Sequence, residues 1–136
     1  MPILRACNIT KRFKGITALD DVSIEIESGR IYGFVGNNGA GKTTFMRIVC
    51  GLTMPDEGTL ELFGSTGNGL SGAREKVGAL IENPIGYPEM SARQNLRALS
   101  LLCRNSSFGQ VDELIEMVGL GKAAKKAIKD YSTGMR

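Results

Sequence analysis

Eight consecutive residues in the first third of the chain have the types and spacing that bind phosphate. They fit the pattern G-x-x-x-x-G-K-[ST] and run Gly36-Asn37-Asn38-Gly39-Ala40-Gly41-Lys42-Thr43. Glycine leaves the backbone bare and permits positive φ, so Gly39 and Gly41 allow successive N–H groups, up to that of Thr44, to turn inward as an anion-binding nest. We expect Lys42, the candidate catalytic lysine, to reach the β- and γ-phosphates of a nucleotide and the Thr43 hydroxyl to ligate its Mg²⁺.

The residues on both sides of this loop predict the elements that would hold it. The apolar run at residues 31–35 predicts a strand leading into the loop. After the loop, apolar residues recur at i, i+3, i+4 and i+7, the spacing of one buried helix face; they are Phe45, Ile48, Val49 and Leu52. The dipole of such a helix favours negative charge at its N-terminus. The alternative, a glycine-rich turn that binds nothing, is disfavoured because both flanks match.

The composition limits the classes of protein to which the chain can belong. The 136 residues make one domain's worth of chain, 42% hydrophobic and 23% charged with a formal net charge of +3, as in an ordinary soluble globular protein. Cys7, Cys50 and Cys103 are odd in number and widely spaced, so we expect reduced, cytosolic thiols rather than a zinc site or a disulfide framework. No apolar stretch is long enough to span a membrane and no signal peptide opens the chain, so a membrane function would need a second polypeptide.

Basic residues gather near the end of the chain, and they are Lys122, Lys125, Lys126 and Lys129. We interpret them as a solvated helix face and expect no nucleic-acid partner, because no aromatic residues interleave with them. A nucleic-acid surface is the alternative.

Apolar patterning predicts the remaining strands. Residues 3–9 are strand-like, residues 22–27 and 59–63 alternate apolar and polar side chains, and residues 77–81 are apolar enough for a strand buried on both faces. Residues 65–72 are predicted to form a loop.

The character of the chain becomes helical after Glu82. Ser91 and Gln94 form a capping box ahead of an apolar face made by Leu96, Leu99 and Cys103. A second helix face consists of Val111, Leu114, Ile115 and Val118, and Gly119 ends that helix. We therefore predict an α/β part at residues 1–82 and a helical part at residues 83–136.

Phe13 stands in a basic stretch, residues 11–15, for which we predict a turn. An aromatic side chain there is either packed in the core or exposed as a stacking platform, and isolated aromatic residues are more often packed.

Taken together, these features resemble the ATP-binding subunits of ABC transporters. That family's phosphate loop commonly reads GPNGAGKTT, and residues 36–44 differ from it only at Asn37. Tyr131-Ser132-Thr133-Gly134-Met135 stands where the family carries its LSGGQ signature, with Ser132 and Gly134 matching. The resemblance implies an α/β P-loop NTPase fold of the ABC ATPase type, with an antiparallel β subdomain and P-loop core at residues 1–82 and a helical subdomain, up to the signature, at residues 83–136.

The resemblance also assigns roles to two single residues. Phe13 falls where the family carries an aromatic residue that stacks on adenine, which reverses the preference for a core role. Glu82 falls where the family has a glutamine that touches Mg²⁺ and senses the transmembrane partner, so Glu82 becomes a metal and catalytic candidate; a strand-end glutamate without a role is the alternative. A glutamate at this place with a YSxGM signature looks most like the bacitracin-resistance and lantibiotic-immunity type of peptide exporter.

Some of the family's hydrolytic residues have no counterpart in the chain. The family continues past the signature into an apolar strand ending in Asp-Glu and then a switch histidine, and this chain contains no histidine. We therefore expect an N-terminal fragment that lacks the C-terminal part of the core, including the general base, and that is inactive alone.

The mechanism that the resemblance implies is hydrolysis of Mg-ATP between two such subunits, identical or different. Ser132, Thr133 and Gly134 of one subunit would face the γ-phosphate held by the loop of the other. Residues 84–97 would lie near a transmembrane permease subunit, which implies a peripheral protein at the cytoplasmic face of the cell membrane.

Three rival classes remain. A nucleotide or metabolite kinase shares the phosphate loop but not this order of motifs. A non-transport ABC ATPase of DNA repair or of the ribosome shares more; the chromosome-handling type would show long heptads, which are absent here. A non-enzymatic scaffold is disfavoured because Lys42 and Thr43 are intact.

Overall fold

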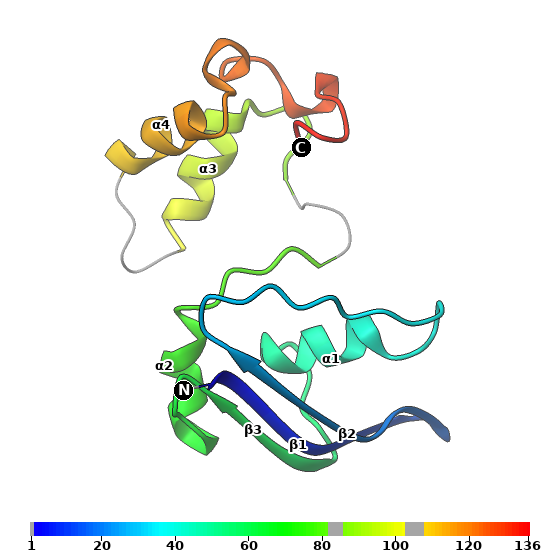
Figure 1. Ribbon diagram of the computed structural model, residues 1–136. Coiled ribbons are helices and arrows are strands. Elements are labelled where there is room, and N and C mark those ends of the chain that lie inside the picture. The colour runs from blue at the N-terminus through cyan, green and yellow to red at the C-terminus, as the bar shows by residue number, and fades with distance from the viewer. Residues whose placement is uncertain (1, 82–85, 103–107) are drawn as a thin grey trace. The chain divides into compact units, whose positions relative to one another are not determined.

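The computed structural model describes residues 2–81, 86–102 and 108–136 (Figure 1). The chain divides into two compact units, Met1–Glu82 and Asn83–Arg136. The first unit is built on a sheet and the second on helices.

A three-stranded antiparallel sheet forms the base of the first unit. Its order is β2 (Ile16–Glu27), β1 (Pro2–Phe13), β3 (Glu57–Leu62), so β1 is central. Ala6 of β1 lies opposite Ile24 of β2 and Leu60 of β3, which places apolar side chains of all three strands together. The strands predicted at residues 3–9, 22–27 and 59–63 are confirmed, although β1 and β2 are longer and Phe63, with a φ of 49°, lies outside β3.

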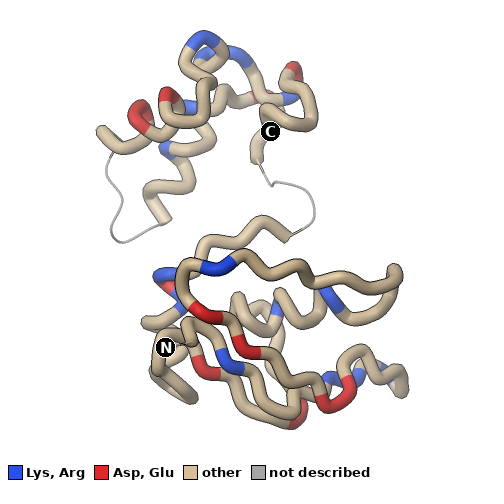
Figure 2. Tube along the Cα trace, in the orientation of Figure 1, with Lys and Arg blue, Asp and Glu red and all other residues tan. Residues whose placement is uncertain are grey.

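Charged residues also occur along the three strands of the sheet (Figure 2). Arg5 of β1 pairs with Glu25 of β2 at 2.9 Å and with Glu61 of β3 at 3.9 Å. Such exposed pairs contribute little to stability, but their alternation with buried apolar residues keeps the strand register unique.

The turn between β1 and β2 has only two residues. Lys14 has a φ of 45° and Gly15 a φ of 84°, the left-handed pair that matches the twist of a two-residue hairpin. The turn predicted at residues 11–15 is therefore wrong for its first three residues, because Lys11, Arg12 and Phe13 still pair with β2.

One helix, α1 (Lys42–Val49), packs on the sheet. Phe45 and Ile48 are buried as predicted, whereas Leu52 is 70% exposed because the helix already ends at Val49. The core of this unit comprises Leu4, Ala6, Ile9, Leu19, Phe45, Ile48, Leu60, Leu62 and Ala73.

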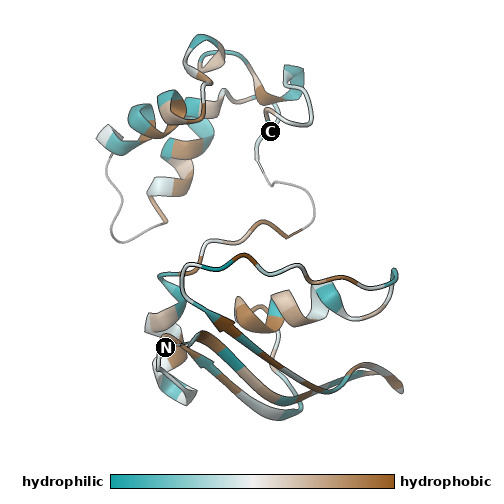
Figure 3. Cartoon of the chain, viewed as in Figure 1, coloured by the Kyte–Doolittle hydropathy of each residue, from teal (hydrophilic) through white to brown (hydrophobic). Residues whose placement is uncertain are grey.

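Two predicted strands are absent from the described part of the chain. Residues 31–35 and 77–81 adopt no strand, and Ile31 and Leu80 are 103% and 72% exposed. Figure 3 shows hydrophobic residues along the extended stretch between β2 and α1. Their apolar character predicts strands inside a sheet covered on both faces, but a strand requires a ladder partner, and the described residues supply none.

The loop predicted at residues 65–72 is partly wrong. A 3₁₀ turn, η1 (Gly67–Gly69), leads into a short helix, α2 (Leu70–Arg74), whose Ala73 is buried in the core. The guanidinium of Arg74 donates to the Val49 carbonyl at 3.0 Å and to the Ile48 carbonyl at 3.3 Å. Because the last carbonyls of a helix lack partners within it, Arg74 completes the C-terminus of α1.

The second unit contains α3 (Ala92–Ser100), α4 (Phe108–Met117) and the 3₁₀ turns η2 (Gly121–Ala123) and η3 (Ile128–Asp130). The capping box of Ser91 and Gln94 is confirmed, and Gly119, with a φ of 72°, follows the end of α4 as predicted. Val111, Ile115 and Ala124 form the core of this unit, and an ion pair of 2.6 Å between Arg93 and Asp112 joins the two helices.

Not every predicted apolar position of this unit is buried. Leu99, Leu114 and Val118 are 50%, 47% and 65% exposed, because the faces they occupy extend beyond the contact between α3 and α4. Cys103 lies outside the described residues. The four lysines near the end are exposed, so the predicted solvation is confirmed. They stand on η2, η3 and the residues between these turns, so the predicted helix face is wrong. Of the helices in the described ranges, none has both the length and the hydropathy for a membrane crossing.

Candidate phosphate-binding site

The glycine-rich loop ends at Gly41, which is the N-cap of α1. Gly41 has a φ of 86°, and a methyl group there would lie 2.2 Å from the carbonyl oxygen of Ala18 and 2.7 Å from Leu19 Cδ2. Only glycine meets both conditions, so β2 and the first turn of α1 approach each other more closely than any other residue would allow. This contact holds the start of the helix against the sheet.

A cavity of about 250 Å³ opens at this helix start. Its lining consists of Ala18, Asn38, Gly39, Gly41, Lys42, Thr43 and Thr44. The first N–H groups of an α-helix have no partner within it, and a glycine N-cap has no side chain to satisfy them. The N-terminus of α1 therefore offers backbone donors, the positive end of a helix dipole, the Thr43 hydroxyl and the Lys42 ammonium to one cavity.

Lys42 folds back over the loop that precedes it. Its ammonium donates to the Gly36 carbonyl at 2.6 Å and to the Asn37 carbonyl at 2.8 Å. The Asn37 carbonyl also accepts from the Ala40 N–H at 3.1 Å, which closes a turn across the tip of the loop, and Gly39 has a φ of 88°. The flexible Lys42 side chain thus reaches across the loop, and its ammonium is able to exchange the two carbonyl acceptors for phosphate oxygens.

Six of the predicted loop residues line the cavity, namely Asn38, Gly39, Gly41, Lys42, Thr43 and Thr44. The other three, Gly36, Asn37 and Ala40, do not line it, and the hydrogen bonds described above join them to Lys42 or to one another. Ala18 also lines the cavity, and sequence reasoning missed it because a small residue in a strand carries no distinctive pattern.

Phe13 ends β1 on the same hairpin that carries Ala18. Phe13 is 46% exposed and is not part of the core cluster, which overturns the core role favoured by the sequence alone; it lies at the end of the strand, next to the two-residue turn. Phe13 pairs with Ile16 across the hairpin, two residues before Ala18 in β2. The exposed ring and the cavity therefore share one end of the hairpin.

The predicted signature segment belongs to the second unit. Ser132, Thr133 and Gly134 are exposed on a turn in which the Ser132 carbonyl accepts from the N–H groups of Met135 and Arg136, at 3.0 and 3.2 Å. Tyr131 anchors this turn, since its ring is only 4% exposed and its hydroxyl donates to the Ala123 carbonyl at 2.6 Å. Glu82 lies outside the described residues.

A larger cavity, of about 810 Å³, lies within the second unit. Its lining is mostly apolar side chains of α3, α4 and the segments after them, and it contains none of the phosphate-loop residues. Its chemistry is therefore unlike that of the loop cavity.

A glycine-rich loop capping a helix beside an antiparallel sheet defines the chain as a P-loop NTPase fold of the ABC ATPase type. Its residues 19–136 match the family model described as ABC transporter, and the chain belongs to that family. The resemblance inferred from the motifs is confirmed.

Similar proteins agree with this assignment. The chain is 36% identical over 135 residues to the bacitracin transport ATP-binding protein BcrA of Enterococcus faecalis, covering 98% of this chain and 44% of that protein. It is 31% identical over 134 residues to the lantibiotic transport ATP-binding protein SrtF of Streptococcus pyogenes, covering 98% and 57%. The chain thus spans about half the length of the curated relatives it matches. A solved ATP-binding subunit of an ABC transporter aligns with a TM-score of 0.80 at 23% identity, over 98% of this chain and 57% of that one, which shows the fold.

Proposed function

We propose that this chain is the nucleotide-binding part of an ABC transporter subunit that couples ATP hydrolysis to transport, with export of an antimicrobial peptide or drug as the transport step. The observation that carries the proposal is the cavity at the start of α1, where backbone donors, one ammonium and one hydroxyl converge. The names of BcrA and SrtF, a bacitracin transport and a lantibiotic transport ATP-binding protein, support the transport of an antimicrobial peptide.

The residues at the cavity fit a magnesium-bound triphosphate. The N–H groups of Gly39, Gly41 and Thr44 donate to phosphate oxygens, and Lys42 exchanges its two carbonyl partners for the β- and γ-phosphates. Because Gly41 has no side chain to clash with Ala18, the backbone at the start of α1 can lie against β2 and beside the cavity. The Thr43 hydroxyl would be an oxygen ligand of Mg²⁺, which would offset the negative charge of the phosphates when bound with the nucleotide. Adenine stacks on the exposed ring of Phe13.

The second unit acts on a partner's nucleotide. Ser132, Thr133 and Gly134 donate to the γ-phosphate held by a second ATPase subunit, identical or different, so each site is completed in trans. A solved ATP-binding cassette of similar fold, dimeric and bound to ADP and Pi, supports this pairing. We further propose that residues 83–136 are the helical subdomain, that residues 84–97 lie near a transmembrane permease, and that the protein therefore works at the cytoplasmic face of the membrane. A solved relative in fold that is part of the transporter complex cbiONQ supports a permease partner.

Binding of Mg-ATP to the 136-residue chain tests the proposal directly. Titration calorimetry should detect weak binding, and Lys42→Ala should weaken it at least about tenfold because the flexible charge on the β- and γ-phosphates is lost. Lys125→Ala, an exposed lysine in the second unit, is the matched control and should leave binding unchanged.

Hydrolysis is a separate readout. We expect these 136 residues alone to hydrolyse ATP no faster than background, because a positioned general base raises the rate about 10²- to 10⁴-fold and the resemblance assigns that role to none of them. Turnover that disappears in Lys42→Ala would show that this part of the proposal is wrong, and equal ATP binding by Lys42→Ala and the unaltered chain would overturn the nucleotide site itself.

A further inference from the structure

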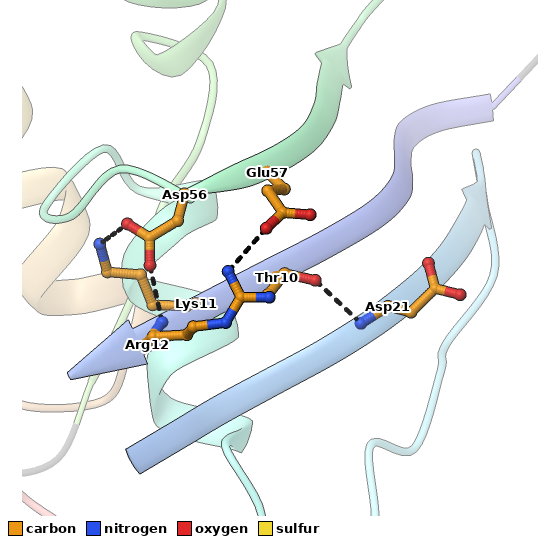
Figure 4. A network of polar contacts seen from close by, with 6 residues as sticks. All are labelled: Thr10, Lys11, Arg12, Asp21, Asp56 and Glu57. Carbon is orange, nitrogen blue, oxygen red and sulfur yellow. Dashed lines mark hydrogen bonds and ion pairs between the residues drawn. The ribbon is translucent and has the colours of Figure 1, made fainter. Parts of the chain in front are cut away.

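Beside the exposed ring of Phe13, the end of β1 is tied to the start of β3 by one carboxylate. Asp56 Oδ2 accepts from the Arg12 N–H at 2.7 Å, and Asp56 Oδ1 lies 2.7 Å from the Lys11 ammonium (Figure 4). The Asp56 N–H in turn donates to the Thr10 carbonyl at 2.9 Å. Asp56 therefore contacts Thr10, Lys11 and Arg12, the three residues of β1 that directly precede Phe13.

The strand is held from its other side as well. Thr10 is 4% exposed, and its hydroxyl accepts from the Asp21 N–H of β2 at 3.1 Å (Figure 4). The backbone leading to Phe13 is thus fixed between β2 and the turn before β3, so the direction of the Phe13 side chain is set by contacts on both sides.

The ring itself has a charged neighbour. The Lys11 ammonium lies 5.3 Å from the centroid of the Phe13 ring, within the range of a cation–π contact. The Lys11 side chain is only 14% exposed, so its stem is packed and the position of its charge is defined by Asp56. The contact occupies one side of a ring that is still 46% exposed, so the rest of the ring is open to a flat ligand.

We propose that Lys11 and Asp56 are positioning residues for the base of the bound nucleotide: Asp56 fixes the Lys11 ammonium, the ammonium holds the Phe13 ring, and the ring is thereby presented to the purine. The inference rests on the proposed nucleotide site. Its physical basis is preorganisation, because a ring already held in one rotamer loses less conformational freedom when a base stacks on it.

The electrostatics of Asp56 agree with this arrangement. The hydrogen bond from Lys11, followed by that from the Arg12 N–H, lowers the pKa of the Asp56 carboxyl below its ordinary value of 3.8. Asp56 is therefore charged at neutral pH, as the contact with the ammonium requires.

The test compares ATP with tripolyphosphate, which offers phosphates and no base. Asp56→Asn keeps the shape of the side chain but removes its charge, and Lys11→Met keeps the stem but removes the ammonium. Both should weaken Mg-ATP binding about three- to tenfold while changing tripolyphosphate binding by less than about twofold, the range expected of one cation–π contact and its anchor. Phe13→Ala should show the same selectivity, and Lys11→Met combined with Phe13→Ala should bind ATP no more weakly than Phe13→Ala alone.

The neighbouring residue supplies the matched control. Glu57 pairs with the Arg12 guanidinium at 2.6 Å and is itself half exposed, but no contact joins it to Lys11 among the interactions in the described part of the chain. Glu57→Gln should therefore bind both ligands as the unaltered chain does, and the melting temperatures of all variants confirm that they are folded.

The outcomes separate this inference from the proposed function. Equal weakening of ATP and tripolyphosphate, an effect of Glu57→Gln as large as that of Asp56→Asn, or additive effects of Lys11→Met and Phe13→Ala would each overturn the positioning role while leaving the nucleotide site in place. Failure of the unaltered chain to bind either ligand would overturn both.

Discussion

Gly41 packs directly against the carbonyl oxygen of Ala18, at a distance that leaves no room for a side chain: a methyl group on Gly41 would lie 2.2 Å from that oxygen. This contact is made by backbone atoms of β2, which are held in the sheet and are unable to move aside as a flexible side chain would. It is also the contact that forms one wall of the cavity at the start of α1. Stability and the proposed phosphate binding therefore depend on the same atoms.

Gly41→Ala should destabilise the first unit and remove phosphate binding together. The positive φ of 86° and the clash with Ala18 act in the same direction, and we expect a loss of about 3 kcal/mol in the free energy of unfolding. Gly29→Ala is the matched control, because Gly29 also has a positive φ, of 72°, but no atom lies close enough to clash with an added methyl group. This variant should lose only about 1 kcal/mol in the free energy of unfolding, the cost of the backbone conformation. Urea denaturation measures both, and equal losses in the two variants would show that the contact with Ala18 is unimportant.

The sequence predicted the phosphate loop residue by residue but not its surroundings. The loop can be recognised in the sequence because the required residue types are rare and closely spaced. Ala18 lines the cavity only because the fold places β2 against Gly41, and the sequence does not show that contact. In the sequence, Asp56 likewise looks like an ordinary turn residue. Its hydrogen bond from the Arg12 N–H depends on the pairing of β1 with β3 and is not visible in the sequence.

The apolar runs at residues 31–35 and 77–81 show the converse limit. Their apolar composition predicts strands, because strands that are buried on both faces of a sheet consist almost entirely of apolar residues. Pairing, however, is a property of two segments, and the described residues hold no partner for either run. The helix caps were predictable because they are local: Ser91 and Gln94 satisfy each other within four residues.

Asn95 should be the most sensitive polar residue of the second unit. It is 8% exposed; its amide oxygen accepts from the Tyr87 N–H at 2.7 Å, and its amide nitrogen donates to the carbonyls of Tyr87 and Ser91, each at 3.1 Å. Asn95→Asp removes the donors and places a carboxylate against those carbonyls. We expect a loss of about 2 kcal/mol or more in the free energy of unfolding of this unit at neutral pH.

The pH dependence distinguishes this cause from a simple loss of packing. Burial and the neighbouring carbonyls raise the pKa of the introduced carboxyl above its unfolded value, so the charged form destabilises the folded state. The deficit should therefore shrink as the pH falls, because the protonated carboxyl is again a donor. Asn95→Ala, which does not titrate, should show a deficit independent of pH, and a parallel behaviour of the two variants would contradict the hydrogen-bond explanation.

The exposed apolar runs of the first unit should make the chain associate with itself. Ile31 and Val35 are 103% and 92% exposed, and the backbone between them is unpaired with any strand in the described ranges. An extended apolar segment with free backbone groups is a template for pairing with another chain. Light scattering should therefore show a mass that rises with concentration, and Val35→Lys should reduce the rise. A monomer at every concentration would contradict this prediction.

Variants of Glu82 test the proposed coupling between ATP hydrolysis and transport. The test uses the whole subunit assembled with the proposed membrane partner. A carboxylate offers only acceptors and a full negative charge to Mg²⁺ and the γ-phosphate, whereas the amide that the family carries at this place also donates from its N–H₂ group. In the proposed site the phosphate loop supplies most of the contacts to the nucleotide, because its residues line one cavity. Loss of the Glu82 side chain should therefore leave ATP binding nearly intact.

Transport and hydrolysis should respond differently to changes at Glu82. Glu82→Ala should impair transport far more than ATP binding, because the link between the metal site and the permease is lost. Glu82→Gln should keep hydrolysis within about tenfold, a difference of roughly 1.4 kcal/mol or less in the barrier, while altering the number of ATP molecules used per transported substrate. Glu25→Gln is the control, since Glu25 is exposed, pairs with Arg5 at 2.9 Å on the sheet and belongs neither to the phosphate loop nor to residues 84–97. If both Glu82 variants transport as the unaltered protein does, the residue is structural and its assignment to the metal is wrong.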